Sequence, residues 1–287
     1  MDFAIHDGEL YLLFPDEVLS NRRAGKFVRK LPGPFTHLAV GARGAVLVAE
    51  GRTALLVGSG KTFELPAGID ELIADAEGFL ARCGQDIFRV QENQPVARIE
   101  GLRTLAVHRG RLVAGTERDY VRMGEDQAEV CGRLPAAPIN ALASDGEHLW
   151  AATDRGIWRQ AGDGSFRYFA PRRWLDNDQV VDVAVAPSGD VFALTQTGLN
   201  RIEFRMMTLA AKAKHYDEKI RQRHIRYGFC SELRLKVPGD ITTAEMIDTD
   251  NDGSWSNYYL ASQAFRFGAT GDPQARSNAW ETFEALE

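Results

Sequence analysis

The chain has 287 residues, of which 44% are hydrophobic and 26% are charged, and its formal net charge at pH 7 is −6. This composition is typical of a globular protein, and the acidic balance disfavours nucleic acid as a partner of the whole chain. No apolar run approaches the ~20 residues of a membrane-spanning helix. The first residues are acidic and lack the basic-then-apolar order of a signal peptide, and the sequence does not identify the cellular compartment. The three cysteines form no CxxC pair, which indicates neither a metal knuckle nor a disulfide framework.

One unit of sequence recurs from residue 1 to about residue 204. Its clearest copies are residues 139–159 and 181–201, each of which reads as three apolar strands separated by glycine turns. Weaker copies extend the series of turn glycines, which are spaced 36, 34, 32, 36 and 43 residues apart: Gly8, Gly44, Gly78, Gly110, Gly146 and Gly189. This period predicts a mainly β fold, a β-propeller of about six blades, closed by contact between the first and last repeats. Leucine-rich and helical repeats fit less well, because neither an Asn or Cys ladder nor a 3.6-residue stripe occurs before residue 207.

The two clearest copies resemble the two-component-regulator type of propeller repeat. The resemblance rests on an Asp-Gly turn, a Leu-Trp-x-x-Thr strand and a following glycine: Asp145, Gly146, Leu149, Trp150, Thr153 and Gly156, then Gly189, Val191, Phe192, Thr195 and Gly198. The first of these glycines usually stands closer to the Leu-Trp pair. That repeat occurs in sensors and in extracellular polysaccharide-degrading enzymes, so the resemblance implies a fold without choosing a function.

One loop lengthens the last repeat. Residues 171–178 contain Trp174, which is a candidate substrate-binding residue in a functional insertion. Trp150, Trp158 and Phe192 lie at the repeat spacing and are expected to pack in the core.

The period changes after residue 206. A basic helix is expected at 207–226, a half-buried strand at 229–237 and an acidic loop at 240–252, followed by a helix from Ser254 to a cap at Gly271. A second helix begins at Pro273, with an apolar stripe of Ala275, Ala279, Trp280, Phe283 and Leu286. The predicted domains are a propeller at 1–205, a linker helix and strand at 206–240, and an incomplete helical domain at 241–287.

This helical hairpin resembles the start of an α/α-toroid, the six-hairpin glycosidase-like fold. The resemblance covers residues 228–287 and rests on Asp-Asn-Asp-Gly-x-Trp-x-x-x-Tyr, Ala-Phe-Arg-Phe and Thr-Gly-Asp-Pro. In that fold, loops at one end of the helices form a sugar site. The resemblance implies that the remainder of the helical domain is missing from this chain, which is expected to have little catalytic activity by itself.

Three carboxylates alternate before Gly253, and three interpretations of them stay open. Asp248, Asp250 and Asp252 are the opening half of a calcium loop, although Tyr259 stands where an EF-hand needs its bidentate Glu, which excludes a complete EF-hand. The same acids also suit the start of a helix, where the dipole favours negative charge. The third interpretation is a sugar site, with Asp250 and Asp252 as acid and base and with further contacts from Asn251, Trp255 and Tyr258.

Two basic residues follow the first helix. His224 is a candidate catalytic group and Arg226 a candidate ligand for an acidic sugar, because arginine pairs with carboxylates. Both also fit a helix C-terminus, where the dipole favours cations. The sequence therefore predicts a propeller-containing, carbohydrate-active protein that binds a polysaccharide or oligosaccharide, with Ca²⁺ as candidate cofactor. The parent protein, of which this chain is expected to be a fragment, is predicted to be a polysaccharide hydrolase or lyase. The alternative is a ligand-sensing or scaffold propeller without catalysis.

Overall fold

The computed structural model describes residues 2–6, 9–20, 27–124, 128–170, 173–237, 240–247 and 249–287. They divide into two compact units, Met1–Phe204 and Arg205–Glu287. Residues 206–240 belong to the same unit as residues 241–287. None of the helices in these ranges is both long enough and apolar enough to cross a membrane.

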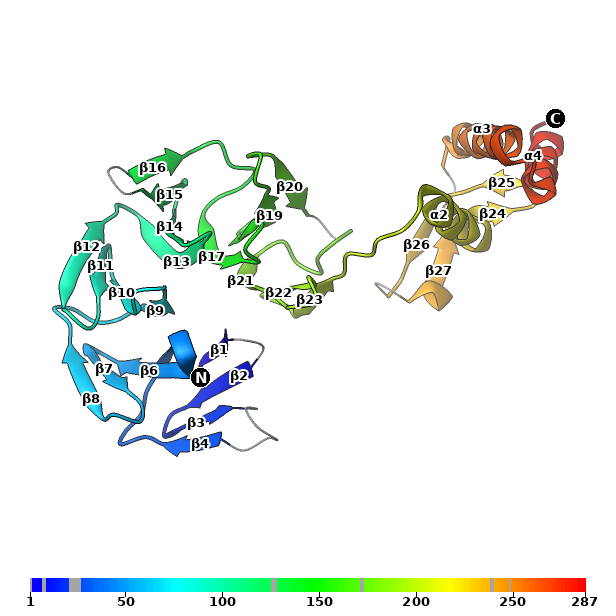
Figure 1. The fold of residues 1–287 in the computed structure, drawn as a ribbon. Helices are drawn as coiled ribbons and strands as arrows, with labels where there is room; N and C mark the ends of the chain where they lie inside the picture. Colours follow the sequence, from blue (N-terminus) through cyan, green and yellow to red (C-terminus); the bar gives the residue numbers. More distant parts are fainter. Residues whose placement is uncertain are drawn as a thin grey trace. The chain divides into compact units, whose positions relative to one another are not determined.

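The first unit consists of antiparallel sheets in which each strand pairs with the next one along the chain (Figure 1). The first three sheets are β1 (Asp2–His6), β2 (Glu9–Phe14), β3 (Glu17–Ser20) and β4 (Phe27–Lys30); β5 (His37–Gly41), β6 (Ala45–Glu50), β7 (Thr53–Leu56) and β8 (Lys61–Glu64); and β9 (Glu71–Ala74), β10 (Phe79–Cys83), β11 (Asp86–Arg89) and β12 (Gln94–Arg98).

The remaining sheets are β13 (Leu102–His108), β14 (Arg111–Thr116), β15 (Tyr120–Met123) and β16 (Ala128–Cys131); β17 (Ile139–Ser144), β18 (Leu149–Thr153), β19 (Gly156–Gln160) and β20 (Phe166–Phe169); and β21 (Val180–Val185), β22 (Val191–Thr195) and β23 (Leu199–Ile202). In the described chain the last sheet thus has three strands and the others four. The unit is a six-blade β-propeller, as the sequence predicts.

The predicted turn glycines occupy the same place in every described blade, close to the turn between its first two strands. Gly44, Gly78, Gly110, Gly146 and Gly189 have φ values of 72°, 143°, 73°, 85° and 84°. These angles are open to glycine and strained for other residues, which explains why the turns recur as glycine. Gly8, the remaining glycine of the series, lies outside the described residues.

Short polar side chains fix the turns of the best-matching blade. The Asp145 carboxylate accepts hydrogen bonds from the backbone N–H of Glu147 and His148 and from Nε1 of Trp150. At the far end of β18, the Thr153 hydroxyl donates to the carbonyl of Gly156 over 2.7 Å. The same hydroxyl-to-carbonyl bond recurs at Thr195, to Gly198, and at Thr116, to Asp119. The Asp and Thr positions of the repeat are therefore explained by the hydrogen bonds that their side chains make in the turns.

Apolar cores lie between neighbouring blades along the series from β1–β4 to β21–β23. Trp150 and Trp158 are buried in them, as predicted. Among the described residues, no such core joins the last blade to the first, and the last blade has exposed leucines, Leu194 at 45% and Leu199 at 68%. Across that interface the carboxylates of Asp2 and Asp182 interact electrostatically. Among the described residues, the predicted contact between the first and last repeats therefore includes no apolar core.

Polar side chains on the inner strands also join neighbouring blades. The Asp2 carboxylate accepts a hydrogen bond from the Leu38 N–H over 2.8 Å, and Asn140 donates from Nδ2 to the Val180 carbonyl over 2.9 Å. Asp182 holds the position on β21 that Ala141, next to Asn140, holds on β17. In the part of the chain that the structure describes, its carboxylate accepts only from its neighbour, the Val183 N–H. Burial, and secondarily the Asp2 carboxylate, raise the pKa of Asp182.

We expect Asp182→Asn to stabilise the propeller by ~1 kcal/mol at pH 7. A carboxyl whose folded pKa is raised destabilises the fold once it ionises, so the penalty is absent below the unfolded pKa of about 3.9 and complete above the folded pKa. The gain should therefore shrink as the pH falls towards 4. Urea unfolding at several pH values measures it, with the exposed Asp163→Asn as control. A gain that does not vary with pH would contradict the prediction.

The second unit contains α2 (Leu209–His224), β24 (Ile225–Arg226), β25 (Phe229–Cys230), β26 (Leu233–Leu235), β27 (Ala244–Met246), α3 (Asp252–Thr270) and α4 (Pro273–Leu286). The predicted helices are confirmed, with Gly271 in the left-handed conformation after α3 and the Asp272 carboxylate capping α4. The single strand predicted at 229–237 is wrong, because the chain pairs β25 with β24 and then β26 with β27.

The buried face of α4 differs from the predicted apolar stripe. Ala275, Asn278 and Thr282 are buried, whereas Trp280 and Phe283 remain 59% and 44% exposed. On α3 the buried residues are likewise mostly polar: Ser256, Tyr259 and Gln263. The hairpin therefore packs through small and polar side chains, and part of its aromatic surface stays exposed.

Candidate functional site

The second unit contains a cavity of about 540 Å³ between α2, the β25–β26 segment and α3. Its lining residues combine aromatic, imidazole, thiol and carboxylate groups: Ile220, His224, Cys230, Ser231, Glu232, Leu233, Trp255, Tyr258, Tyr259 and Ser262. Three predicted site residues, His224, Trp255 and Tyr258, thus line the same cavity. A cavity of this size and composition is typical of small-molecule sites.

His224 is held in one orientation by the backbone beside it. Its Nδ1 lies 3.0 Å from the carbonyl oxygen of Ser231, and the Ser231 N–H donates to the His224 carbonyl over 2.9 Å. A carbonyl oxygen can only accept, so Nδ1 carries the proton in the neutral ring and Nε2 is the acceptor. The imidazole of the cavity can therefore accept a hydrogen bond or a proton at Nε2.

Aromatic rings form another wall of the cavity. Trp255 and Tyr258 are 41% and 69% exposed, and their ring centroids lie 6.2 Å apart. Nε1 of Trp255 donates to the Glu232 carboxylate over 3.2 Å, which fixes the indole and places a carboxylate beside it. Partial accessibility of Trp255 is confirmed. Tyr259 is buried, and burial raises the pKa of its hydroxyl to about 12.

The cysteine in the cavity is not an activated thiol. Burial, and secondarily the negative charge of Asp252, raise the pKa of Cys230. A thiol with a raised pKa stays protonated at neutral pH, and neither nucleophilic attack nor metal ligation is favoured. His224 and Glu232 are the imidazole and carboxylate groups that line the cavity.

The acidic loop is separate from the residues that line the cavity. Asp250 and Asn251 are exposed beside the first turn of α3, and the Asp252 carboxylate accepts a hydrogen bond from the Thr249 hydroxyl over 3.2 Å. Asp248 lies outside the described residues, so the calcium loop stays a prediction. Elsewhere in the described chain, no three His, Cys, Asp or Glu side chains come together in a group that could hold a metal ion.

The two other predicted ligands have structural contacts. Arg226 donates from Nη1 to the carbonyls of Gln222 and Ile225, over 3.3 and 2.7 Å, which matches the helix-end interpretation. Trp174 belongs to the propeller unit, where its ring packs edge-on against Phe169 at 5.3 Å.

The loop that contains Trp174 is fastened by Asp176, which the sequence did not single out. Its carboxylate accepts from the hydroxyls of Thr195 and Thr197 and from Nδ2 of Asn200. These hydrogen bonds lower the pKa of Asp176 to about 2. The loop is therefore anchored to the last blade by a carboxylate that stays ionised.

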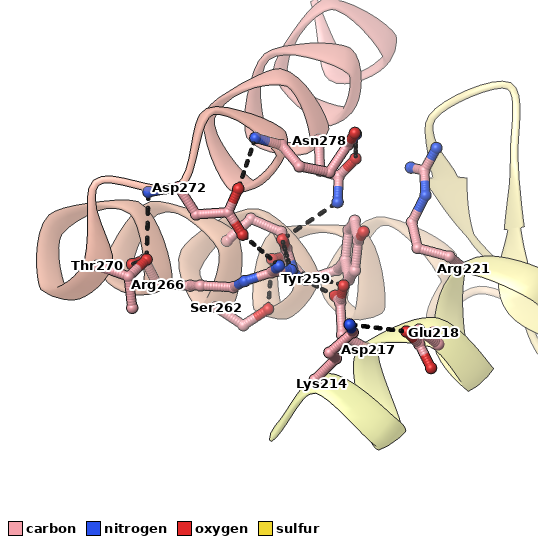
Figure 2. Close-up of polar contacts among 12 residues, drawn as sticks. Lys214, Asp217, Glu218, Arg221, Tyr259, Ser262, Arg266, Thr270, Asp272 and Asn278 are labelled. Carbon is pink, nitrogen blue, oxygen red and sulfur yellow. Dashed lines mark hydrogen bonds and ion pairs between the residues drawn. The ribbon is translucent and has the colours of Figure 1, made fainter. Parts of the chain in front are cut away.

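A polar network fixes α2 against the α3–α4 hairpin (Figure 2). The Arg266 guanidinium lies between two carboxylates, 2.6 Å from Asp217 and 2.5 Å from Asp272. Gln263 donates to Asp217 and accepts from Nδ2 of Asn278 over 3.3 Å. Tyr259, Gln263 and Arg266 share one helical face, a spacing that could have indicated the network. Because α2 and α3 both line the cavity, this network sets the distance between its walls.

Comparisons with known proteins support the propeller. The structure is similar to the extracellular domain of the hybrid two-component system BT4673 from B. thetaiotaomicron, with 17% identity and a TM-score of 0.56, over 72% of this chain and 32% of that one. It is also similar to a streptogramin B lyase, with 11% identity and a TM-score of 0.57, over 71% and 78% of the two chains. The third is Hsv2p of Kluyveromyces lactis, with 16% identity and a TM-score of 0.57, over 78% and 77%.

These likenesses show the fold alone, because every identity is below 20%. The chain spans about a third of the length of the BT4673 domain. No protein-family model and no curated protein matches the sequence.

Proposed function

We propose that the second unit binds a saccharide in the cavity between α2, the β25–β26 segment and α3. The observation that carries the proposal is the pair of accessible rings, Trp255 and Tyr258, beside the Glu232 carboxylate. Aromatic faces complement the apolar C–H face of a sugar ring, while carboxylate and imidazole groups accept hydrogen bonds from its hydroxyls.

The same groups suit proton transfer on a bound sugar. Glycoside hydrolysis uses carboxyl groups as acid and base, and an oriented imidazole can exchange a proton at its free nitrogen. His224 and Glu232 are therefore the proposed reactive groups, and Glu232 supplies the carboxylate for which the sequence suggested Asp250 and Asp252. We extend the proposal to a carbohydrate-active parent protein, a polysaccharide hydrolase or lyase.

The proposal also includes the α/α-toroid. The hairpin has the expected caps at Gly271 and Asp272. Phe265, Trp280 and Phe283 are 80%, 59% and 44% exposed, which is the surface that neighbouring helical hairpins would cover.

Ligand sensing without catalysis is the second candidate function. It is supported by the fold likeness to the extracellular domain of a two-component system. Both functions involve ligand binding, and turnover separates them. Product release from a bound oligosaccharide that is lost in His224→Gln favours the enzyme.

Trp255→Ala is expected to weaken saccharide binding by about tenfold, because the sugar loses its aromatic face. Calorimetric titration of the whole chain with neutral cello-oligosaccharides and acidic oligogalacturonates measures the effect. Trp280→Ala is the matched control, because Trp280 is similarly exposed but does not line the cavity. Equal affinity in wild type and Trp255→Ala, or no binding of either saccharide class, would refute the proposal.

A further inference from the structure

The propeller contains a second cavity, of about 600 Å³, between the β13–β16 and β17–β20 blades. The turn between β13 and β14 contributes His108, Arg109 and Arg111, and β15 contributes Tyr120 and Arg122. The turn after β19, at residues 160–164, forms the opposite wall. Several cationic groups thus converge on one polar cavity that the saccharide proposal does not use.

Among the described residues that line the cavity, the arginines outnumber the carboxylates, which are Glu129 and Asp163. Glu129 pairs with Arg122 at 3.1 Å, and the Asp163 carboxylate accepts from the N–H and hydroxyl of Ser165. Arg109 donates to a backbone carbonyl, that of Glu147, over 2.8 Å. Arg111 has no hydrogen-bond or ion-pair partner among the described residues. Two guanidinium groups at the cavity therefore have no carboxylate partner in that part of the chain.

The pKa of His108 is affected by the same positive charge. Burial lowers the pKa of His108, and the charges of Arg109 and Arg122 lower it further, while Asp145 opposes them. The Nδ1 of His108 is 2.8 Å from the Ser144 hydroxyl. An imidazole in this environment is neutral at pH 7, which leaves the guanidinium groups as the cations of the cavity.

The backbone is shaped around Arg109. Its φ of 53° lies in the left-handed region, which non-glycine residues rarely adopt. Across the cavity, a Cβ on Gly162 would lie 2.7 Å from an Nη atom of Arg109, so the glycine leaves room for the guanidinium. Behind them, Arg122 donates to the Tyr120 hydroxyl over 3.3 Å, and that hydroxyl donates to Gln160. Arg109 and Arg122 are thus held in place by their neighbours, while Arg111 makes no hydrogen bond or ion pair with the described residues.

The corresponding cavity between the next two blades has a different charge pattern. It measures about 620 Å³ and is lined by Asp145, Glu147, His148 and Arg159. Arg159, the one arginine among the described residues that line this cavity, lies over the Trp150 ring at 5.4 Å. The cluster of three arginines is therefore a property of the β13–β20 cavity and does not follow from the blade geometry.

We propose that the cavity between the β13–β16 and β17–β20 blades binds a small anionic ligand through its oxyanion, with Arg109 and Arg111 as the binding residues. Guanidinium groups match the planar, bidentate geometry of carboxylate and phosphate oxygens. A carboxylate-bearing sugar or metabolite and a phosphorylated one share this chemistry.

Calorimetric titration of the whole chain with glucuronate, inorganic phosphate and glucose tests the proposal and identifies the oxyanion. We expect at least one of the two anions to bind while glucose does not enter this cavity, and Arg111→Gln to weaken anion binding about tenfold. The Arg111→Gln variant should fold normally, because the Arg111 side chain makes no hydrogen bond or ion pair with the described residues. Arg109→Gln should have a similar effect on affinity.

The matched control is Arg98→Gln, which removes the same charge from an exposed ion pair with Asp86 on another blade. It should leave the affinity unchanged. Absence of binding by both anions, or an equal loss in Arg98→Gln and Arg111→Gln, would overturn the proposal. The Trp255→Ala variant should bind the anion normally, which separates this site from the saccharide cavity.

Discussion

Replacing Glu71 with alanine is expected to lower the free energy of unfolding by about 2 kcal/mol. Glu71 begins β9, and its carboxylate reaches the next blade, where it accepts from the Leu105 N–H over 3.0 Å and from the Thr104 hydroxyl over 2.9 Å. It also accepts from Nε of Arg82 over 3.2 Å on its own sheet. One side chain therefore satisfies donors on two blades.

The size of the effect follows from what the truncation leaves behind. Burial raises the pKa of Glu71, while the hydrogen bonds from Leu105 and Thr104 and the charge of Arg82 lower it, so the carboxylate depends on these partners. In the alanine variant the Leu105 N–H and the Arg82 guanidinium lose their acceptor inside the interface, and an unsatisfied donor costs about 1–3 kcal/mol.

Chemical denaturation of the whole chain measures the loss, with Glu77→Ala as control. Glu77 pairs with Arg89 at 2.9 Å but its side chain is 79% exposed, so its removal should change stability by less than about 1 kcal/mol. Similar losses in the two variants would show that Glu71 acts only as a surface charge.

Local patterns made the blades predictable, whereas contacts between distant residues did not follow from the sequence. Gly146, Asp145 and Thr153 shape turns through residues only a few positions away in the sequence, so their spacing indicates the turn directly. Glu71 acts across 34 residues, and nothing in its own stretch of chain distinguishes it from a surface acid. In the described part of the chain, the lack of an apolar core between the first and last blades is equally a property of faces far apart in sequence.

The same distinction holds in the second unit. Trp255 and Tyr258 were predicted from the aromatic face of the helix beside the acidic loop, and His224 from the arginine beside it. Glu232 was missed, because its position depends on the break between β25 and β26, which the alternating pattern of residues 229–237 concealed. The stripe on α4 differs from the buried face because Asn278 buries its amide in a network that only the folded hairpin provides, and Thr282 is buried as well.

Gly228→Ala is expected to destabilise the second unit by about 3 kcal/mol. Tyr227 and Gly228 form the two-residue turn between β24 and β25, with φ values of 53° and 85°. Positive φ at both central residues is the type I′ turn that matches the twist of a hairpin, and glycine is preferred there. A Cβ at Gly228 would also lie 2.6 Å from the Glu281 carbonyl and 2.7 Å from the Ala285 Cβ. Because the first is backbone of α4, the helix would have to move.

That displacement would reach the saccharide cavity. The hairpin leads directly into Cys230 and Ser231, which line the cavity, and the Cys230 N–H donates to the Ser256 hydroxyl of α3 over 2.9 Å. Gly228→Ala should therefore weaken saccharide binding as well as stability, whereas Gly268→Ala provides the matched control. Gly268 lies in α3, and a Cβ added there would have no described atom within 4 Å beyond its chain neighbours and the backbone of its own helix, so alanine should stabilise the helix by ~0.5–1 kcal/mol. Hydrogen exchange of peptides from residues 209–287 measures both changes within this unit, and equal protection in the two variants would show that the hairpin does not rest on α4 through Gly228.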